Sequence, residues 1–359
     1  MALYQPGSSV SSEQSPQESS SQSFVAGVDI GGTSLRLTLA SMTATIVGRW
    51  STSTVGIRNP DLIVRLICEG VDALLEEQLS SRADLRAIAA GAPGITDTEK
   101  GIVLATSYLM GWTDVPLRDL LEAALGVPAF VDNDVNMAAL GEYHAGVARG
   151  FNNFVFLAIG TGVGAGIILN GQLFRGEGWI AGEIGYMLVP GVSVRPVEGE
   201  VPGALEEIVG GEGIRRHWQS IWSEDGTSLA REATATQIFD HAQHDPLAQT
   251  VLERCSRTLA YAIYNISLVL NCPLFVLGGS VGLHPALGDA TRELLKKQNE
   301  RVQPRVAASS IGTEAQLTGA IHQAIEIANA SCSAKGELPS PHVDLTTPAV
   351  TLIGPANID

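Results

Sequence analysis

FVAGVDIGGTSLRLTLA, residues Phe24–Ala40, places a Gly-Gly-Thr turn between two runs of apolar residues. Such a turn between two β-like runs predicts a strand, a tight turn and a second strand. The pattern returns at Asn153–Trp179, NFVFLAIGTGVGAGIILNGQLFRGEGW, where apolar runs flank a Gly-Thr-Gly turn and an Asn-Gly turn follows. Two copies of one pattern predict an internally duplicated α/β chain whose two similar lobes bring these turns together.

Further elements are expected around the two hairpins. Apolar residues at three- and four-residue spacing predict helices, and short apolar runs that end in glycine predict buried strands. The expected strands are Ala44–Thr54, Arg86–Asp97 and Pro273–Gly279, and Phe130–Gly146 is expected to be a strand end followed by a helix. The expected helices are Asp61–Ser81, Ser256–Asn271 and Thr313–Ala330.

The domain organisation is expected to be a tail, two lobes and a second tail. Residues 1–23 are rich in Ser and Gln and predict a disordered tail. The first α/β lobe is expected at residues 24–135 and the second at residues 136–312. The final helix, about residues 313–330, is expected to return to the first lobe, and residues 331–359 form a Pro-rich tail without assignment.

Composition narrows the class of partner. The chain has 359 residues, with 22 Lys and Arg against 38 Asp and Glu, a formal charge of −16. This field repels nucleic acid and anionic membranes. A phosphate site must therefore act locally, through backbone amides, helix N-termini and a metal ion.

Cysteine spacing and hydropathy indicate a cytoplasmic protein. Cys68, Cys255, Cys272 and Cys332 are far apart in sequence, and none forms a close pair of the kind that zinc or redox centres use. No signal peptide is visible, and the apolar run Phe154–Leu169 is interrupted by turn formers and too short for a membrane span.

The glycine-rich turns have three possible interpretations. Gly160–Ala165 fits the dinucleotide pattern G-x-G-x-x-A, but that motif must open a helix, and the apolar run that follows predicts a strand. The turns are either merely tight turns or phosphate sites, because bare glycine N–H groups and a neighbouring Thr hydroxyl can hold a phosphate. Leu277–Ser280 offers a third bare backbone surface, suited to the nucleoside.

Two acidic segments are candidates for catalysis. Asp29 lies among apolar residues before Gly31 and Gly32, where a hydrated magnesium ion would offset the cost of burying its charge, unless it only caps the turn. Val131–Asn136, VDNDVN, supplies donors and acceptors for a polyhydroxylated ligand and a carboxylate that could accept a hydroxyl proton. The alternative for this segment is a helix N-cap cluster.

Over about residues 24–330, the chain resembles the ROK (repressor, open reading frame, kinase) family of sugar kinases, which has the two-lobed actin-like (ribonuclease H-like) ATPase fold. The resemblance implies ATP and Mg²⁺ as cofactors, with magnesium near Asp29 and Asp134 as the catalytic base. It also implies a cytoplasmic homodimer that binds sugar and nucleotide. The implied nucleotide-binding residues are Asp29, Gly31, Gly32, Thr33, Gly160, Thr161, Gly162, Gly278 and Gly279, and the implied sugar-binding residues are Gly91, Pro93, Asn133, Glu183 and Glu206.

The chain also departs from the family pattern. Tyr186 stands where the family has His, and no cysteine occurs between Cys68 and Cys255, so the family's Cys-rich zinc site is not expected. Tyr186 is therefore a candidate sugar contact that changes sugar preference, and Glu207 rivals its neighbour Glu206 as the second sugar carboxylate. The repressor branch would require a DNA-binding domain before Phe24.

Three functions remain open at this point. The first is an active hexose kinase, with glucose as the leading substrate and N-acetylmannosamine or another hexose as alternatives. The second is a sugar sensor without catalysis, suggested by Tyr186 and the lost zinc motif. The third is a kinase that uses polyphosphate, which the low Lys and Arg content disfavours.

Overall fold

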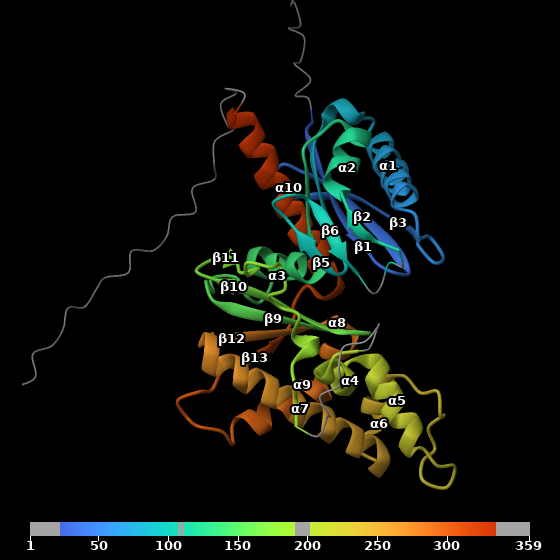
Figure 1. Ribbon diagram of the computed structural model, residues 1–359, viewed down its shortest axis with the longest axis vertical. Helices are drawn as coiled ribbons and strands as arrows, with labels where there is room; N and C mark the ends of the chain where they lie inside the picture. The colour runs from blue at the N-terminus through green and yellow to red at the C-terminus, as the bar shows by residue number, and fades with distance from the viewer. Residues whose placement is uncertain (1–21, 107–108, 110, 191–201, 335–359) are drawn as a thin grey trace, which may run out of the picture.

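The computed structural model describes residues 22–106, 109, 111–190 and 202–334. The predicted tails lie outside the described residues, except for residues 22–23 and 331–334. Two sheets, each covered by helices, form an elongated molecule of two lobes (Figure 1).

The first lobe contains a five-stranded sheet in the order β3-β2-β1-β4-β8. The first three strands are antiparallel, and β1, β4 and β8 are parallel. Two helices cover its outer face (Figure 1). The bounds are β1 Phe24–Ile30, β2 Ser34–Ser41, β3 Ile46–Ser53, α1 Pro60–Glu77, β4 Leu85–Ala92, α2 Leu117–Leu125 and β8 Ala129–Asn133, and a small sheet is formed by β5 Ile95–Asp97, β6 Ile102–Ala105 and β7 Thr113–Val115.

The second lobe repeats this topology strand for strand, in the order β11-β10-β9-β12-β13. The predicted duplication is confirmed, because both glycine turns join the central strand to its antiparallel neighbour in each sheet. The bounds are β9 Phe154–Ile159, β10 Val163–Leu169, β11 Gln172–Leu173, α4 Ala204–Val209, α5 Gly211–Ile221, α6 Ala235–His241, α7 Pro246–Leu270, β12 Leu274–Gly278, α8 Gly279–Gly282, α9 Pro285–Leu295 and β13 Arg305–Ala308.

Helices α3 (Asp134–Ala145) and α10 (Ala315–Ala334) lie between the two sheets (Figure 1). They approach backbone to backbone, since a Cβ on Gly141 would lie 2.1 Å from the Ala315 carbonyl oxygen. Helix α3 also packs on the second sheet, where Ala139 lies against Gly166 of β10. The N-terminus of α3 is therefore fixed by contacts with both lobes.

Several predicted helix boundaries were wrong. The predicted helix Ser256–Asn271 is the second half of α7, which begins at Pro246 because Asp245 caps it and proline favours the first helical turn. The last helix begins at Ala315, after a 3-10 turn, and runs to Ala334. None of the described helices combines the length and apolar composition that a membrane span requires.

Two stacked histidines at the α3–α10 contact should make stability depend on pH. The rings of His144 and His322 are parallel within 9°, with centroids 4.2 Å apart. Burial lowers the pKa of both, and burial together with the smaller effect of neighbouring His144 lowers the pKa of His322 to about 4. The unfolded chain therefore binds more protons, so the unfolding free energy should fall as pH drops from about 6.5 toward 4, by up to about 1.4 kcal/mol per pH unit for each proton.

Urea unfolding at pH 7.5, 6 and 5 measures this dependence. His322→Gln should flatten it, whereas the matched surface variant His244→Gln should retain it. An unchanged pH dependence in His322→Gln would show that the stacked pair is not its source.

Candidate active site

The carboxyl ends of three parallel strands bring the predicted acidic residues to one edge of the first sheet. Asp29 of β1 pairs in register with Gly91 of β4, and Gly91 pairs with Asp132 of β8. Ligand sites in α/β folds lie at this edge. The two acidic segments predicted from sequence therefore meet in the fold.

Asn133 caps α3, as the N-cap interpretation predicted. Its Oδ1 accepts hydrogen bonds from the Val135 N–H at 2.8 Å and the Asn136 N–H at 3.2 Å. Its Nδ2 donates to the Gly94 carbonyl at 2.9 Å, which leaves one amide N–H for a ligand. The cap and a sugar contact are therefore compatible roles.

The predicted sugar loop contributes mainly by packing. Gly91 and Pro93 are both buried. A Cβ on Gly91 would lie 3.2 Å from the Asp134 Cα, so the glycine lets α3 approach β4 closely. The loop thus sets the position of Asp134, while Gly94 holds Asn133.

Asp132, which belongs to the predicted polar segment Val131–Asn136, is a buried anchor between the lobes. It is 1% exposed, and its Oδ2 accepts hydrogen bonds from Arg175 Nε at 2.9 Å and Nη2 at 2.6 Å. Its Oδ1 accepts from the Asn136 side chain at 2.9 Å. Because Arg175 follows β11, this ion pair ties the second lobe to the strand that precedes α3.

Asp29 has a partner within the protein, which the sequence analysis missed. Arg36, opposite Asp29 in the β1–β2 hairpin, donates to Asp29 Oδ2 from Nε at 2.9 Å and from Nη2 at 2.6 Å. Its Nη1 donates to the Thr313 carbonyl at 2.8 Å. Burial still raises the pKa of Asp29, and Arg36 opposes that rise. Magnesium is thus not needed to neutralise Asp29 in the free protein.

Asp134 begins α3 and is only partly exposed. Burial raises the pKa of Asp134 to about 7, and the negative charges of Asp29 and Glu183 add to this rise. The Val135 N–H donates to its Oδ1 at 2.9 Å and opposes the rise. Asp134 therefore lies within electrostatic range of both Asp29, beside the first glycine turn, and the predicted sugar carboxylate Glu183, and its pKa suits a general base.

The raised pKa of Asp134 predicts the pH dependence of catalysis. A base must be deprotonated to accept a proton, so kcat/KM should fall about tenfold per pH unit below pH 7 and level off above it. Rates at pH 5.5 to 9 measure this profile, and Glu183→Gln, which removes one negative charge, should shift its midpoint downward. A flat profile between pH 5.5 and 7 would contradict the assignment of Asp134 as the base.

The predicted sugar carboxylates converge in the second lobe. Burial and the charge of Glu206 raise the pKa of Glu183. Burial raises the pKa of Tyr186, with Glu183 and Glu206 adding to the rise, so the half-exposed phenol stays protonated near both carboxylates. Glu206 Oε2 accepts from the Val163 N–H at 2.9 Å. Of the two rivals, Glu206 rather than Glu207 thus acts electrostatically on Glu183 and Tyr186.

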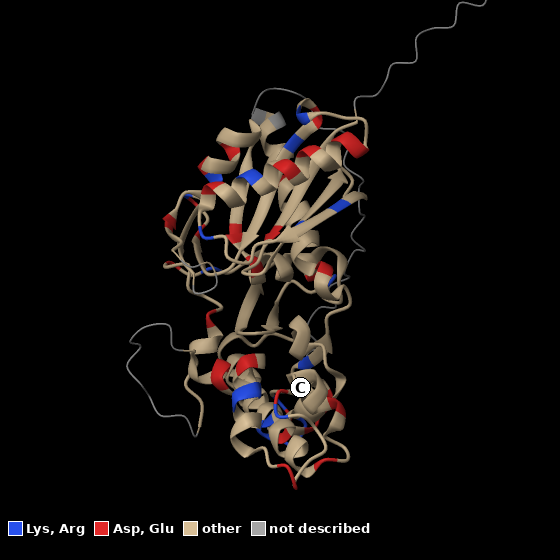
Figure 2. Ribbon diagram, turned by 90° about the vertical axis from the view of Figure 1, so that its right-hand side faces the viewer, with Lys and Arg blue, Asp and Glu red and all other residues tan. Residues whose placement is uncertain are grey.

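The predicted nucleotide residues cluster at two turns. Thr33 and Thr161 are exposed at the β1–β2 and β9–β10 turns, and nothing lies within 4 Å of a Cβ built on Gly160. Gly278 pairs with Ala158 beside the second turn. Acidic residues are distributed over both lobes (Figure 2), so an anionic phosphate must be held here by local donors rather than by the protein's general field. The N–H groups of Gly31 and Gly160 already donate within their turns, to the Ser34 carbonyl at 2.8 Å and the Gly162 carbonyl at 3.0 Å. The other predicted nucleotide-binding glycines lie close by: Gly31, Gly32 and Gly162 in the two turns, and Gly279 at the start of α8.

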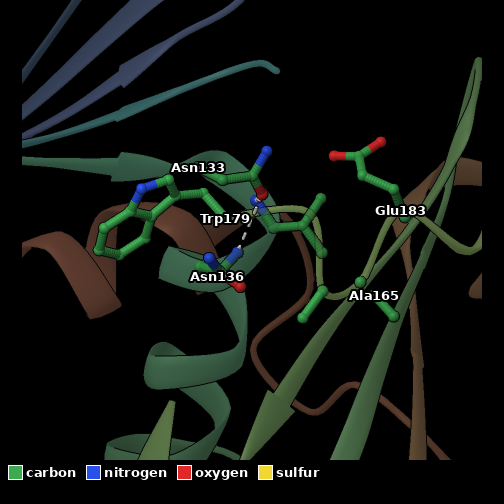
Figure 3. A pocket seen from close by; sticks show the side chains of 9 residues that line it. Asn133, Asn136, Ala165, Trp179 and Glu183 are labelled. Carbon is green, nitrogen blue, oxygen red and sulfur yellow. Dashed lines mark hydrogen bonds between the residues drawn. The ribbon is translucent and has the colours of Figure 1, made fainter. Parts of the chain in front are cut away.

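A small pocket joins the two lobes beside Asp134. Asn133 and Asn136 lie on one side of it with Trp179, and the carboxylate of Glu183 lies on the other (Figure 3). The remaining lining residues are Val135, Gly164, Ala165, Ala181 and Gly182. Arg36, Arg175 and Trp179 were not predicted from the sequence, whereas Asp132 and Asn136 lie in the predicted polar segment Val131–Asn136.

The expected metal was magnesium near Asp29, without a zinc site. Over the ranges that the structure describes, no group of three or more His, Cys, Asp or Glu residues is placed to hold a metal ion. Hydrated magnesium needs only one or two carboxylates together with substrate phosphates, and Asp29 keeps one carboxylate oxygen, Oδ1, outside its ion pair with Arg36. The expected lack of zinc stays a prediction.

Comparison with known proteins identifies the family. The model of the ROK family matches residues 25–327. This chain belongs to the ROK family. A glucokinase of Halalkalibacterium halodurans is 32% identical over 314 residues, which cover 83% of this chain and 94% of that protein. An N-acetylmannosamine kinase of Salmonella typhi is 29% identical over 293 residues, covering 82% and 95%.

A solved structure is similar to this chain over most of its length. The crystal structure of a ROK family glucokinase from Streptomyces griseus in complex with glucose and AMPPNP matches with a TM-score of 0.69 at 26% identity. The match covers 84% of this chain and 99% of that one. The predicted family and the actin-like two-lobed fold are confirmed, and this ROK protein is a sugar kinase.

Proposed function

We propose that this ROK protein transfers the γ-phosphoryl group of ATP to a hexose hydroxyl, with glucose as the leading acceptor and the 6-hydroxyl as the site of attack. One observation carries the proposal. Asp134, with a pKa of about 7, lies at the start of a helix packed against both lobes, within electrostatic range of Asp29 and Glu183. The relatives named glucokinase support glucose as the acceptor.

In this proposal Asp134 accepts the proton of the attacking hydroxyl as its oxygen forms a bond to the γ-phosphorus. The leaving group is ADP, and the proton ends on the Asp134 carboxylate. Asn133 orients the sugar with its free amide N–H, while Glu183 and Glu206 accept hydrogen bonds from hydroxyls. Glu206 is already held by the Val163 N–H, so its carboxylate is oriented before sugar binds.

The two glycine turns would hold the nucleotide phosphates through backbone N–H groups and the hydroxyls of Thr33 and Thr161. Gly278 and Gly279 would form the surface beside the nucleoside. Asp29 would hold hydrated magnesium, which supplies neutralisation of phosphate charge when bound.

A second acceptor, N-acetylmannosamine, is supported by the Salmonella typhi relative. Tyr186 also supports a changed preference, because its phenol lies near both sugar carboxylates. An ADP-release assay with glucose, N-acetylmannosamine, N-acetylglucosamine, mannose, fructose and allose tests both acceptors. Turnover only with N-acetylated sugars would reject glucose, and sugar binding without turnover would favour the sensor.

The neighbouring glutamates provide a matched test of the sugar site. Glu206→Gln should raise KM for the sugar about tenfold or more, because a charged acceptor of hydroxyl hydrogen bonds becomes a neutral amide. Glu207→Gln should leave KM within about twofold of wild type, since most surface changes away from a site are near neutral. KM for ATP should stay constant in both variants. Equal effects of the two changes on the sugar KM would contradict the assignment of Glu206.

A further inference from the structure

Trp179 has a backbone conformation that is unusual for its residue type. Its φ is +62°, in the left-handed region that favours glycine. For a bulky side chain this conformation is an outlier that costs free energy, and such residues cluster at functional sites. The surrounding structure must therefore hold Trp179 in place.

The Trp179 side chain lines the pocket between the lobes. On its side of the pocket lie the amides of Asn133 and Asn136, and Glu183 lies opposite (Figure 3). The side chains of Val135, Ala165 and Ala181 supply further apolar lining. A wall that combines an aromatic ring with amides and a carboxylate matches a sugar ring, which has apolar C–H faces and a polar hydroxyl edge.

The indole N–H of Trp179 has no hydrogen-bond partner among the described residues. By contrast, three other tryptophans donate to carbonyl oxygens: Trp112 to Arg58 at 3.1 Å, Trp218 to Ala230 at 3.0 Å and Trp222 to Leu229 at 2.8 Å. Buried or pocket-facing indoles normally find such a partner. The free N–H of Trp179 is thus available to a ligand.

We propose that Trp179 is a sugar-contacting, specificity-determining residue, whose ring packs against a C–H face of the hexose and whose N–H donates to one of its hydroxyls. This inference rests on the proposed function, because it assigns the pocket beside Asp134 to the sugar. It explains why a strained tryptophan is placed where glycine would fit the backbone better.

Fluorescence titration tests the contact directly. Hexose added without nucleotide should change the tryptophan emission of the wild type saturably. Trp179→Phe should abolish that change, while Trp50→Phe should retain it. Trp50 is the matched control, since it is half-buried on β3 and its indole also has no partner among the described residues.

Calorimetric affinity and thermal stability provide the second test. Trp179→Gly should weaken hexose binding about tenfold or more, the scale of one aromatic contact plus one hydrogen bond. The same change should leave the melting temperature unchanged or higher, because glycine suits the positive φ. Trp179→Phe, which keeps an aromatic ring but lacks the N–H, should bind hexose with an affinity between those of the wild type and Trp179→Gly. This second variant keeps the test usable if Trp179→Gly fails to fold.

The outcomes separate this inference from the proposed function. If hexose is phosphorylated but neither the tryptophan emission change nor the hexose affinity is altered by substituting Trp179, the inference is overturned and the kinase proposal stays intact. Hexose binding that depends on Trp179, without turnover on any hexose, would support the inference and overturn the proposed reaction. A wild type that binds no hexose would overturn both.

Discussion

Asp134→Asn is expected to lower kcat by about a thousandfold, the middle of the range for losing a positioned general base. The reason is chemical, because asparagine cannot accept the hydroxyl proton. Sugar affinity should change little, since the amide keeps a side-chain oxygen that can accept from the Val135 N–H. The measurement is single-turnover ADP formation with saturating sugar, alongside calorimetric sugar affinity.

The exposed variant Asp225→Asn is the control for this experiment and should keep wild-type kcat. Because burial raises the pKa of Asp134, its charge opposes folding above pH 7, so Asp134→Asn should be at least as stable as wild type at pH 8. A kcat within about tenfold of wild type, in a folded Asp134→Asn protein, would contradict base catalysis.

Arg175→Met is expected to lower the unfolding free energy by about 3–5 kcal/mol. The change leaves Asp132, which is 1% exposed, with a buried negative charge and no cation. Methionine has a similar volume, so the loss reports the charge rather than a cavity. Urea unfolding at pH 7.5 measures the effect.

The double variant Asp132→Asn with Arg175→Met removes both charges and should recover most of the lost stability. Arg257→Met is the control, because Arg257 is exposed on α7 and makes no ion pair with the described residues. A loss below about 0.5 kcal/mol in Arg175→Met would show that the buried pair contributes little.

Much of the fold could be predicted because its signals are local. The Gly-Gly-Thr turn, the Gly-Thr-Gly turn and the runs beside them are contiguous in sequence, and the two sheets repeat as expected. The Asp29–Arg36 ion pair could also have been predicted from the sequence. In a hairpin centred on Gly32 and Thr33, these residues lie opposite each other.

Other features of the site have no local signal. Asp132 and Arg175 are 43 residues apart, and only the packing of the lobes brings them together. Trp179 could not be predicted, since no sequence pattern marks a tryptophan for a positive φ; tertiary contacts impose it. Helix boundaries failed for a simpler reason, because the cap at Asp245 was not recognised.

Two negative charges, one near each proposed substrate, act on the pKa of Asp134. In the proposed site Asp29 belongs to the phosphate side and Glu183 to the sugar side, and both raise the pKa of the same carboxylate. A cation bound near Asp29 would lower that pKa again, so Asp134 would be a weaker base with magnesium and nucleotide bound than in the free protein. The tuning of Asp134 is thus expected to depend on both ligands.

Phosphorus NMR of the complete reaction tests the central claim most directly. Wild-type protein with ATP, magnesium and the hexose that gives the most ADP release should produce ADP and a sugar 6-phosphate in equal amounts. ATP that remains intact with every hexose in the panel, or that yields only inorganic phosphate, would contradict phosphoryl transfer from ATP to a sugar.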